Sequence, residues 1–310
     1  MFKIKIEECG SQMEEFIVSD DIYDRNGILI LSKGHKLLLD DINKMKLSKF
    51  GVLDKVLNMK RDEETKFSDL STKKRNEIRH NQESWDEKEF EVHKPVLDKS
   101  IQAIASKLPT LDKQSLLKAT EVASNLIFRL RDENWYSHFK VLTNRVDWLY
   151  AHSVNTTIIS AVIGVHLGYS DKRLKELALG ALLHDIGMIL LPTKILNKAG
   201  ELTENEMSMI QNHSELGYEM LKDTELSEIS KKTILQHHEK NDGSGYPNGI
   251  TSIDILEEAK IVMIAEAFDT ATTQRPYQET ISAKMVLDQM IGSPQIYEAR
   301  LVEILNGIIL

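Results

Sequence analysis

Residues 174–187, LKELALGALLHDIG, carry the strongest signal for the fold of this chain. Their apolar side chains recur at steps of three and four residues, the spacing of residues that share one face of an α-helix. The apolar run then stops at His184 and Asp185. A buried histidine and carboxylate cost free energy unless something pairs with them. The segment therefore predicts a core helix that ends at a polar site.

The same period continues through the C-terminal two thirds of the chain. Apolar residues recur at helical steps from about residue 95 onward, as at Leu97, Ile101 and Ile104. The sequence contains no internal repeat and no low-complexity tract. We predict a mainly α protein in which residues 95–310 form an all-α helical bundle.

Two further predicted helices carry polar residues of interest. Residues 203–206, TENE, match a capping box, which predicts the start of a helix that carries His213. Residues 257–272 predict another helix, on which Glu266 and Asp269 lie three residues apart on one face. Ligands that converge from several helices on a common centre are how metal sites form inside bundles.

The first 60 residues follow a different pattern and predict a small α/β module. We expect strands at residues 16–18, 28–31 and 52–56, a hairpin turn at the Asn-Gly pair of 24–27, and a helix at 37–50. Residues 61–94 have many charged and few apolar side chains, which predicts a polar linker. The module contains no catalytic constellation, so it is predicted to be either a structural cap or a regulatory, partner-binding domain.

Composition limits the classes of function. The chain has 310 residues, 41% of them hydrophobic and 28% charged, which is typical of a globular protein. A net charge of -9 argues against binding a nucleic acid polymer, although metals can supply positive charge locally for a small anionic ligand. One cysteine, no signal-peptide pattern and no long apolar run predict a cytoplasmic protein without a membrane span.

A second motif, HHEKNDGSGYP at residues 237–247, places two adjacent histidines before a glycine-rich loop. Imidazole and carboxylate are ligands for transition-metal ions. His152 alone also fits a core histidine, and His213 alone also fits a polar helix face. Taken together, five imidazoles, Asp185 and a downstream acid are enough for two ions, because three or four protein ligands normally satisfy one. Three other histidines are expected at the surface: His35, His80 and His93.

The ordered set of motifs resembles an HD-GYP domain, a branch of the HD phosphohydrolase superfamily. The resemblance extends over about residues 120–294. It rests on His152, His184-Asp185-Ile186-Gly187, His213, His237-His238-Glu239, Asp242-Gly243-Ser244-Gly245-Tyr246-Pro247, Glu266, Asp269 and Arg275-Pro276-Tyr277. Members of the family are helical bundles with a two- or three-metal centre, usually of iron or manganese. They hydrolyse cyclic di-GMP to linear pGpG or to GMP, so the resemblance implies a metal-dependent cyclic di-GMP phosphodiesterase.

The resemblance also implies a ligand set for each of two divalent ions. The ligands of the first ion are implied to be His152, His184 and Glu266. Those of the second are implied to be His213, His237 and His238. Asp185 would bridge the two ions, so His184 and Asp185 are the residues expected at the catalytic centre. Iron or manganese is the expected metal, and zinc is also compatible with these ligands.

Contacts with the substrate are implied in the same way. Tyr246, Asp269 and Arg275 match family positions that contact the nucleotide or its phosphates, and the guanidinium of Arg275 offers a fork of donors to a phosphate. Cyclic di-GMP is the expected ligand. A protein partner at the N-terminal module or the Gly-Tyr-Pro loop, and a homodimer, are further expectations.

Three residues depart from the family pattern. The family has lysine where this chain has Met188, so a phosphate-binding cation is missing. It usually has aspartate where this chain has Glu266, which is one methylene longer. The glutamate that would bind a third metal, one helical turn before His152, is replaced by Trp148, so two metals are expected.

These departures leave two alternatives to an active cyclic di-GMP phosphodiesterase. One is a binding or adaptor module that holds metals and ligand but turns over slowly or not at all, because the loss of one phosphate contact typically costs about 100-fold in rate. The other is a hydrolase of a different cyclic dinucleotide or of a phosphomonoester.

Overall fold

The computed structural model divides the chain into two compact units, Met1–Asn81 and Gln82–Leu310. It describes the backbone of five short strands between residues 15 and 61, and residues 93–310 except 130–132, 134, 146, 199 and 275–279; the side chains of 129, 137, 144, 145 and 147 also lie outside this description. The sequence-based boundaries at residues 60 and 94 remain predictions. Within the described residues, no helix combines the length and the apolar character needed to span a bilayer.

The first unit contains strands β1 Glu15–Val18, β2 Ile22–Tyr23, β3 Leu29–Leu31, β4 Lys36–Leu38 and β5 Met59–Arg61. β1 lies between β4 and β5 in an antiparallel sheet, and β2 pairs with β3. The strand expected at 16–18 is confirmed, and the strand expected at 28–31 is confirmed at residues 29–31; residue 28 lies outside the described residues. The helix expected at 37–50 is wrong at its first residues, because β4 pairs with β1 there; its other residues and the strand expected at 52–56 lie outside the described residues.

The second unit is helical, which confirms the mainly α fold predicted from the sequence. The described part of this unit begins with a helix at residues 93–107. The elements that follow are α3 Lys113–Arg129, α4 Tyr136–Arg145, α5 Asp147–His166, α6 Asp171–Leu183, the 3₁₀ helix η2 Ile186–Leu190, α7 Thr193–Leu196, α8 Glu204–Gln211, α9 His213–Leu221, α10 Glu228–Gln236, α11 Glu257–Thr272, α12 Ala283–Ile291 and α13 Ala299–Gly307.

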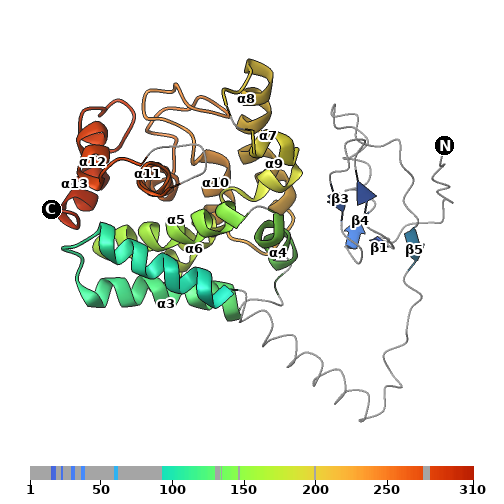
Figure 1. Cartoon of the computed structure of the whole chain (residues 1–310), viewed down its shortest axis with the longest axis horizontal. Coiled ribbons are helices and arrows are strands. Elements are labelled where there is room, and N and C mark those ends of the chain that lie inside the picture. The colour runs from blue at the N-terminus through green and yellow to red at the C-terminus, as the bar shows by residue number, and fades with distance from the viewer. Residues whose placement is uncertain are drawn as a thin grey trace, which may run out of the picture. The chain divides into compact units, whose positions relative to one another are not determined.

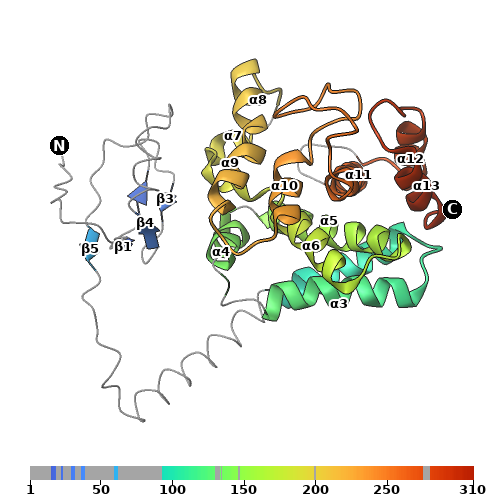
Figure 2. The same ribbon diagram turned by 180° about the vertical axis from the view of Figure 1, so that it is seen from behind.

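Helix α5 is the central element of the bundle. Residues 152–164 are buried without interruption, as expected for a helix enclosed on all sides by other helices. α5 packs against α3, α6 and α11, and α6 packs in turn against α10. Figures 1 and 2 show α3 along one side of α5 and α6, with α10 and α11 on the other. The ends of α5, α6, α10 and α11 therefore lie around a shared interior.

Two local predictions about helices can be compared with the structure. The capping box is confirmed, because Thr203 Oγ1 accepts from the backbone N–H of Glu206 while the Glu206 carboxylate accepts from that of Thr203. The helix it opens, however, ends at Gln211, and His213 is the first residue of α9. The prediction that the helix opened by the capping box carries His213 is therefore wrong, because His213 belongs to the next helix. The second helix, at 257–272, is confirmed with its predicted bounds.

A glycine allows α6 and α10 to approach closely. A Cβ built on Gly180 would lie 2.7 Å from both the Cβ and the Cγ2 of Thr233, well inside van der Waals contact. The helices would have to separate to admit even one methyl group, and overpacking of this kind typically costs about 1–3 kcal/mol.

We expect Gly180→Ala to lower the free energy of unfolding by about 1–3 kcal/mol, measured by urea denaturation. Gly307→Ala is the matched control, because a Cβ at Gly307 meets nothing within 4 Å and alanine favours a helix. That variant should be neutral or slightly more stable. Equal stability of the two variants would contradict the assigned packing.

Candidate metal centre

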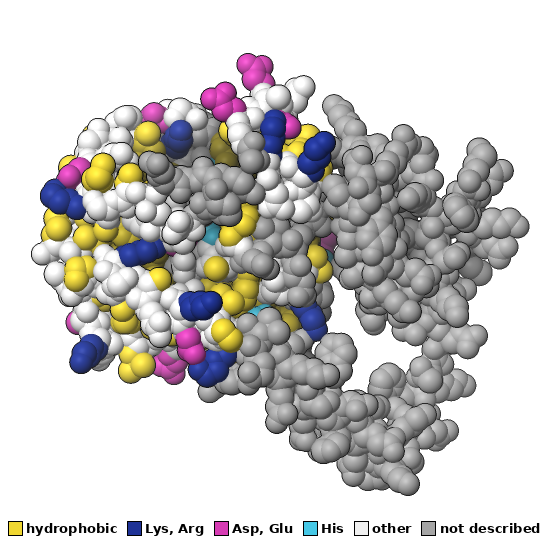
Figure 3. Space-filling view, in the orientation of Figure 1, with side chains coloured by type: hydrophobic (Ala, Val, Ile, Leu, Met, Phe, Trp, Pro, Cys, Tyr) yellow, Lys and Arg dark blue, Asp and Glu magenta, His cyan; other side chains and the backbone are white. Residues whose placement is uncertain are grey.

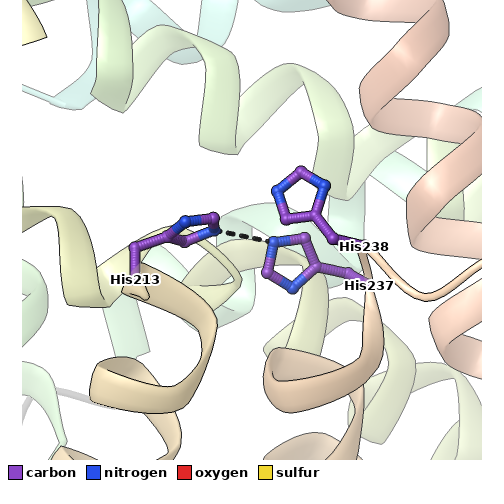
Figure 4. A group of neighbouring side chains, drawn as sticks. All are labelled: His213, His237 and His238. Carbon is purple, nitrogen blue, oxygen red and sulfur yellow. Dashed lines mark hydrogen bonds between the residues drawn. The ribbon is translucent and has the colours of Figure 1, made fainter. Parts of the chain in front are cut away.

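Seven residues from different helices converge inside the second unit. Their polar atoms form two groups, each with all ligand atoms within 4.8 Å of one another. One group consists of His152, His184 and Glu266. The other consists of His213, His237 and His238, shown in Figure 4. Asp185 lies between them, so the structure brings together all seven side chains that the sequence suggested as ligands.

Three of the histidines are oriented by the same interaction at helix ends. His184 is the C-cap of α6, His237 is the C-cap of α10, and His213 follows the C-cap of α8. In each case Nδ1 lies 2.7 Å from the carbonyl oxygen three residues earlier, that of Ala181, Ile234 or Ile210. A carbonyl can only accept, so Nδ1 carries the proton and Nε2 presents its lone pair to the interior.

The fourth buried histidine, His152 of α5, is oriented by a carboxylate. Its Nδ1 lies 2.7 Å from Oδ2 of Asp269 in α11. Asp269 has no exposed surface, and its other oxygen accepts from Asn155 Nδ2 at 2.9 Å and from Thr273 Oγ1 at 2.6 Å. Burial raises the pKa of Asp269, but the hydrogen bond from His152 and the nearby cationic and hydroxyl groups outweigh it, and the pKa falls to about 2. The carboxylate is therefore ionised and accepts the Nδ1 proton of His152.

The lone pairs of His213 and His237 point at each other. Their Nε2 atoms are 3.0 Å apart, as the dashed line in Figure 4 marks, although both Nδ1 atoms already donate to carbonyls. Burial lowers the pKa of both imidazoles, that of His237 to well below its ordinary value, so a shared proton is disfavoured. A metal ion satisfies both nitrogens, because two ligands about 2.1 Å from one ion lie about 3 Å apart when they are adjacent.

Asp185 directs one carboxylate oxygen toward each group. Its Oδ1 lies 3.3 Å from Nε2 of His213, and its Oδ2 lies 3.3 Å from Nε2 of His184 and 3.9 Å from Nε2 of His152. Burial disfavours the charged form, yet His184 and the other imidazoles hold the pKa of Asp185 well below its usual range. The carboxylate is thus an anion between two sets of nitrogen ligands.

Two buried atoms at the centre lack hydrogen-bond partners, namely His184 Nε2 and Asp185 Oδ1. Buried polar atoms without partners are rare and are costly unless an ion or water satisfies them. Burial lowers the pKa of His184, but the negative charge of Asp185 raises it to about 9, so a proton competes with a metal ion for Nε2. The donor set of imidazoles and carboxylates fits divalent transition metals.

Gly187 allows η2 to approach the second group of histidines. A Cβ on Gly187 would lie 1.9 Å from the backbone oxygen of His213 and 2.7 Å from the backbone nitrogen of Gly217. Only glycine permits this approach. Gly187 therefore allows η2, which directly follows Asp185, to pack against the backbone of His213 and Gly217.

Glu239, the residue after His238, holds the loop at residues 241–250 through hydrogen bonds to its backbone. This fully buried carboxylate accepts from the backbone N–H groups of Asn248 and Ile250, at 2.7 Å and 3.2 Å. Gly245 lies so close to the His238 carbonyl that a Cβ would fall 2.4 Å from it. As a result, the ring of Tyr246 stacks on that of His238, with centroids 4.6 Å apart and planes at 27°. Burial raises the pKa of Tyr246, so its phenol stays neutral.

A cavity of about 310 Å³ opens beside the first group of ligands. It is lined by His238, Lys240, Met263, Glu266, Ala267, Thr270, Ala271, Ile296 and Tyr297. Two of the proposed ligands, His238 and Glu266, thus face both the metal centre and this space. Lys240 is the cationic residue of its lining. On the face shown in Figure 3, little histidine surface is visible among the hydrophobic and charged side chains.

The structure changes the interpretation of several residues. Asp269 was expected to contact the nucleotide, but it is completely buried and occupied by internal donors, so we now assign it to orienting His152. Arg275, also expected to contact substrate, lies outside the described residues.

One prediction about the remaining histidines is wrong. His93 is 3% exposed and its Nδ1 lies within hydrogen-bond distance of the Tyr150 hydroxyl, so it does not lie at the surface. His35 and His80 lie outside the described residues. Met188, which stands where the family has lysine, is a buried core residue with 9% of its surface exposed.

Sequence reasoning missed residues that orient the ligands without binding metal themselves. Asn155 lies three residues after His152 on α5. Thr273 is the C-cap of α11, four residues after Asp269. Lys107 comes from the separate helix at 93–107. Asn155 and Thr273 could have been suspected from their helical spacing to His152 and Asp269, whereas no residue near Lys107 in the sequence indicates its partner.

Comparison with known proteins identifies the family. The model of a family described as HD domain matches residues 138–299, more than half of the chain. The chain belongs to the HD domain family. The resemblance to its HD-GYP branch is also confirmed, because several similar curated proteins are named cyclic di-GMP phosphodiesterases.

Three curated relatives illustrate the similarity. The cyclic di-GMP phosphodiesterase response regulator RpfG of Xanthomonas campestris is 37% identical over 39% of this chain and 32% of its own. The cyclic di-GMP phosphodiesterase of Thermotoga maritima is 32% identical over 56% and 46%. The 3'3'-cGAMP-specific phosphodiesterase 2 of Vibrio cholerae is 35% identical over 40% and 24%. The chain thus spans less than half the length of each.

The role of Glu239 can be tested by amide hydrogen exchange. Glu239→Gln keeps the shape of the side chain but replaces one charge-assisted acceptor by an amide donor, so we expect faster exchange at Asn248 and Ile250. The exposed Glu303→Gln is the control and should leave both amides unchanged. Unchanged protection in Glu239→Gln would contradict the anchoring role.

Proposed function

We propose that this chain is a metal-dependent phosphodiesterase that hydrolyses cyclic di-GMP to linear pGpG or GMP. The observation that supports this most is the pair of adjacent ligand groups with Asp185 between them. Two ions held close together are a common solution for phosphodiester hydrolysis. The named activity of the relatives from Xanthomonas and Thermotoga supports the same substrate.

The residues present fit two divalent ions. His152, His184 and Glu266 would hold one, and His213, His237 and His238 would hold the other, with Asp185 reaching both. Iron or manganese suits this mixture of imidazole and carboxylate, and zinc is also accepted by such ligands. When bound, the ions supply a hydroxide at neutral pH and stabilise negative charge on the phosphoryl oxygens.

The protein's own residues position the reactants. Asp185 is anionic and central, so it can orient an attacking water by accepting its hydrogen bond. His184, oriented by the Ala181 carbonyl, fixes the geometry of that carboxylate from the side of α6. Tyr246 presents a neutral phenol beside His238, where it can donate to a phosphate oxygen or a base. These three contacts make up the catalytic and substrate-facing part of the proposal.

The cavity beside Glu266 is the proposed substrate site. Its volume lies at the small end of ligand pockets, so we expect it to take one nucleotide unit. Apolar residues such as Met263 and Ile296 suit a base, while Lys240 suits a phosphate. Arg275 remains a proposed phosphate contact from its sequence motif. A protein partner and a homodimer remain predictions.

A second candidate substrate is another cyclic dinucleotide. The similarity to a 3'3'-cGAMP-specific phosphodiesterase of Vibrio cholerae favours it, because that relative is similar to this chain at an identity comparable to those of the cyclic di-GMP phosphodiesterases. Both molecules contain two phosphodiester bonds between ribose units, which the same metal groups could cleave, and they differ in one base. Comparing initial rates on cyclic di-GMP and 3'3'-cGAMP separates the two candidates.

The metal requirement gives the main test of the proposed function. Protein freed of metal by a chelator should not hydrolyse cyclic di-GMP, and activity should return with Mn²⁺ or Fe²⁺, with products separated by chromatography. His213→Ala and His152→Ala should each lower the bound metal from about two ions to about one per chain and reduce kcat at least about 100-fold. Native protein that binds two ions but forms no linear product with any metal would instead support the binding-module alternative.

Lys240 gives a test of the substrate site. Lys240→Met removes the cation but keeps the length of the side chain, so we expect KM for cyclic di-GMP to rise about 10-fold with the metal content unchanged. Lys172→Met, an exposed lysine on α6, is the control and should leave KM unchanged. The same KM in both variants would remove Lys240 from the substrate site.

A further inference from the structure

Lys107, which lies outside the residues matched by the family model, contacts Asp269, the carboxylate that orients His152. Lys107 ends the helix at residues 93–107, about thirty residues before the match begins at 138. Its Nζ donates to Thr273 Oγ1 at 2.6 Å and lies 3.5 Å from Asp269 Oδ1. The lysine side chain is 15% exposed and the aspartate side chain is fully buried. This is a partly desolvated ion pair, where charge matters more than at an open surface.

The ion pair completes a chain of contacts that ends at His152. Thr273 Oγ1 also donates to Asp269 Oδ1, so the lysine acts on the carboxylate both directly and through this hydroxyl. Asp269 Oδ2 then accepts the Nδ1 proton of His152, whose Nε2 faces Asp185. A buried carboxylate stays ionised only with compensating charge or hydrogen bonds. Among the described residues, Lys107 is the lysine or arginine placed within 4 Å of that carboxylate.

The helix that carries Lys107 is anchored at its other end as well. His93, its first residue, lies 2.9 Å from the Tyr150 hydroxyl, and Tyr150 precedes His152 by two residues on α5. The His93 ring also packs against Phe128 and Phe139. The first residue of the helix is therefore held by α5, which carries His152, and by α3 and α4, which carry the two phenylalanines.

We propose that Lys107 is a positioning residue for His152, and that through Asp269 it sets the affinity of the His152, His184 and Glu266 group for its metal ion. The inference rests on the two-ion centre of the proposed function. It assigns to the helix at 93–107 control over one of the two ions, because no described contact of Lys107 reaches His213, His237 or His238. A displacement of this helix would change one site and spare the other.

The test uses single-site backgrounds in the full chain. His213→Ala leaves the His152 group, and His152→Ala leaves the His213 group, so each can be titrated alone with Mn²⁺ by calorimetry after metal removal. Lys107→Met should weaken Mn²⁺ binding about 10-fold in the first background, as expected for the loss of a group that supports a ligand, and leave the second unchanged. Lys107→Arg should restore most of the affinity, because it restores the positive charge.

Lys99→Met is the matched control, since Lys99 lies exposed on the same helix. It should change neither site. Equal losses in both backgrounds, accompanied by a lower melting temperature, would show a purely structural role and overturn the inference. Unchanged binding in both would overturn it as well. Native protein that binds no Mn²⁺ would overturn the proposed function, whereas native binding of two ions with no effect of Lys107→Met overturns the inference alone.

A second measurement avoids the double variants. In metal-free protein labelled with ¹⁵N-histidine, the Nδ1 proton of His152 should be protected from solvent by Asp269, and Lys107→Met should accelerate its exchange. The Nδ1 protons of His184 and His237 should exchange as in the native chain, because backbone carbonyls hold them. Unaltered exchange at His152 would contradict the proposed role.

Discussion

The geometry of the candidate metal centre depends on the hydrogen bonds that the Nδ1 atoms of its histidines donate. At three helix ends, the imidazole donates to a carbonyl of the last turn, where the helix supplies too few backbone N–H groups for its acceptors. Each contact satisfies the helix end and at the same time turns Nε2 inward. Because the helix ends themselves are fixed by the packing of α6, α8 and α10, the fold specifies the directions of the lone pairs before any ion is bound.

These inward lone pairs make the centre unfavourable without cations. His213 and His237 bring two unprotonated nitrogens to 3.0 Å, and Asp185 adds a buried negative charge between the groups. Burial opposes protonation of His213, His237 and His238, which removes the simplest alternative to a metal. The arrangement costs free energy in the absence of ions and regains it on binding them, so metal binding and the stability of this region are coupled.

Local sequence patterns predicted the parts of this structure that depend on local chemistry. Helix 257–272 and the capping box at Thr203 follow from periodicity and side-chain hydrogen bonding over a few residues, and both are confirmed. The break before His213 was not predicted, because it depends on the imidazole taking the Ile210 carbonyl. Asp269 is enclosed by contacts with His152, 117 positions away, and with Lys107, 162 positions away, and no local pattern contains such contacts.

Glu266 shows how a departure from a family pattern can be accommodated. A longer side chain could have carried its carboxylate past the ligands, yet the oxygen lies within 4.8 Å of the ligand atoms of His152 and His184 and 3.8 Å from Nε2 of His238. The residue also lines the cavity, which places its carboxylate at the boundary between the centre and the proposed substrate site. Its carboxylate therefore contributes negative charge both to the ligand group and to the lining of the cavity. Lys240 lines the same cavity, so a cation is available there to offset part of that negative charge.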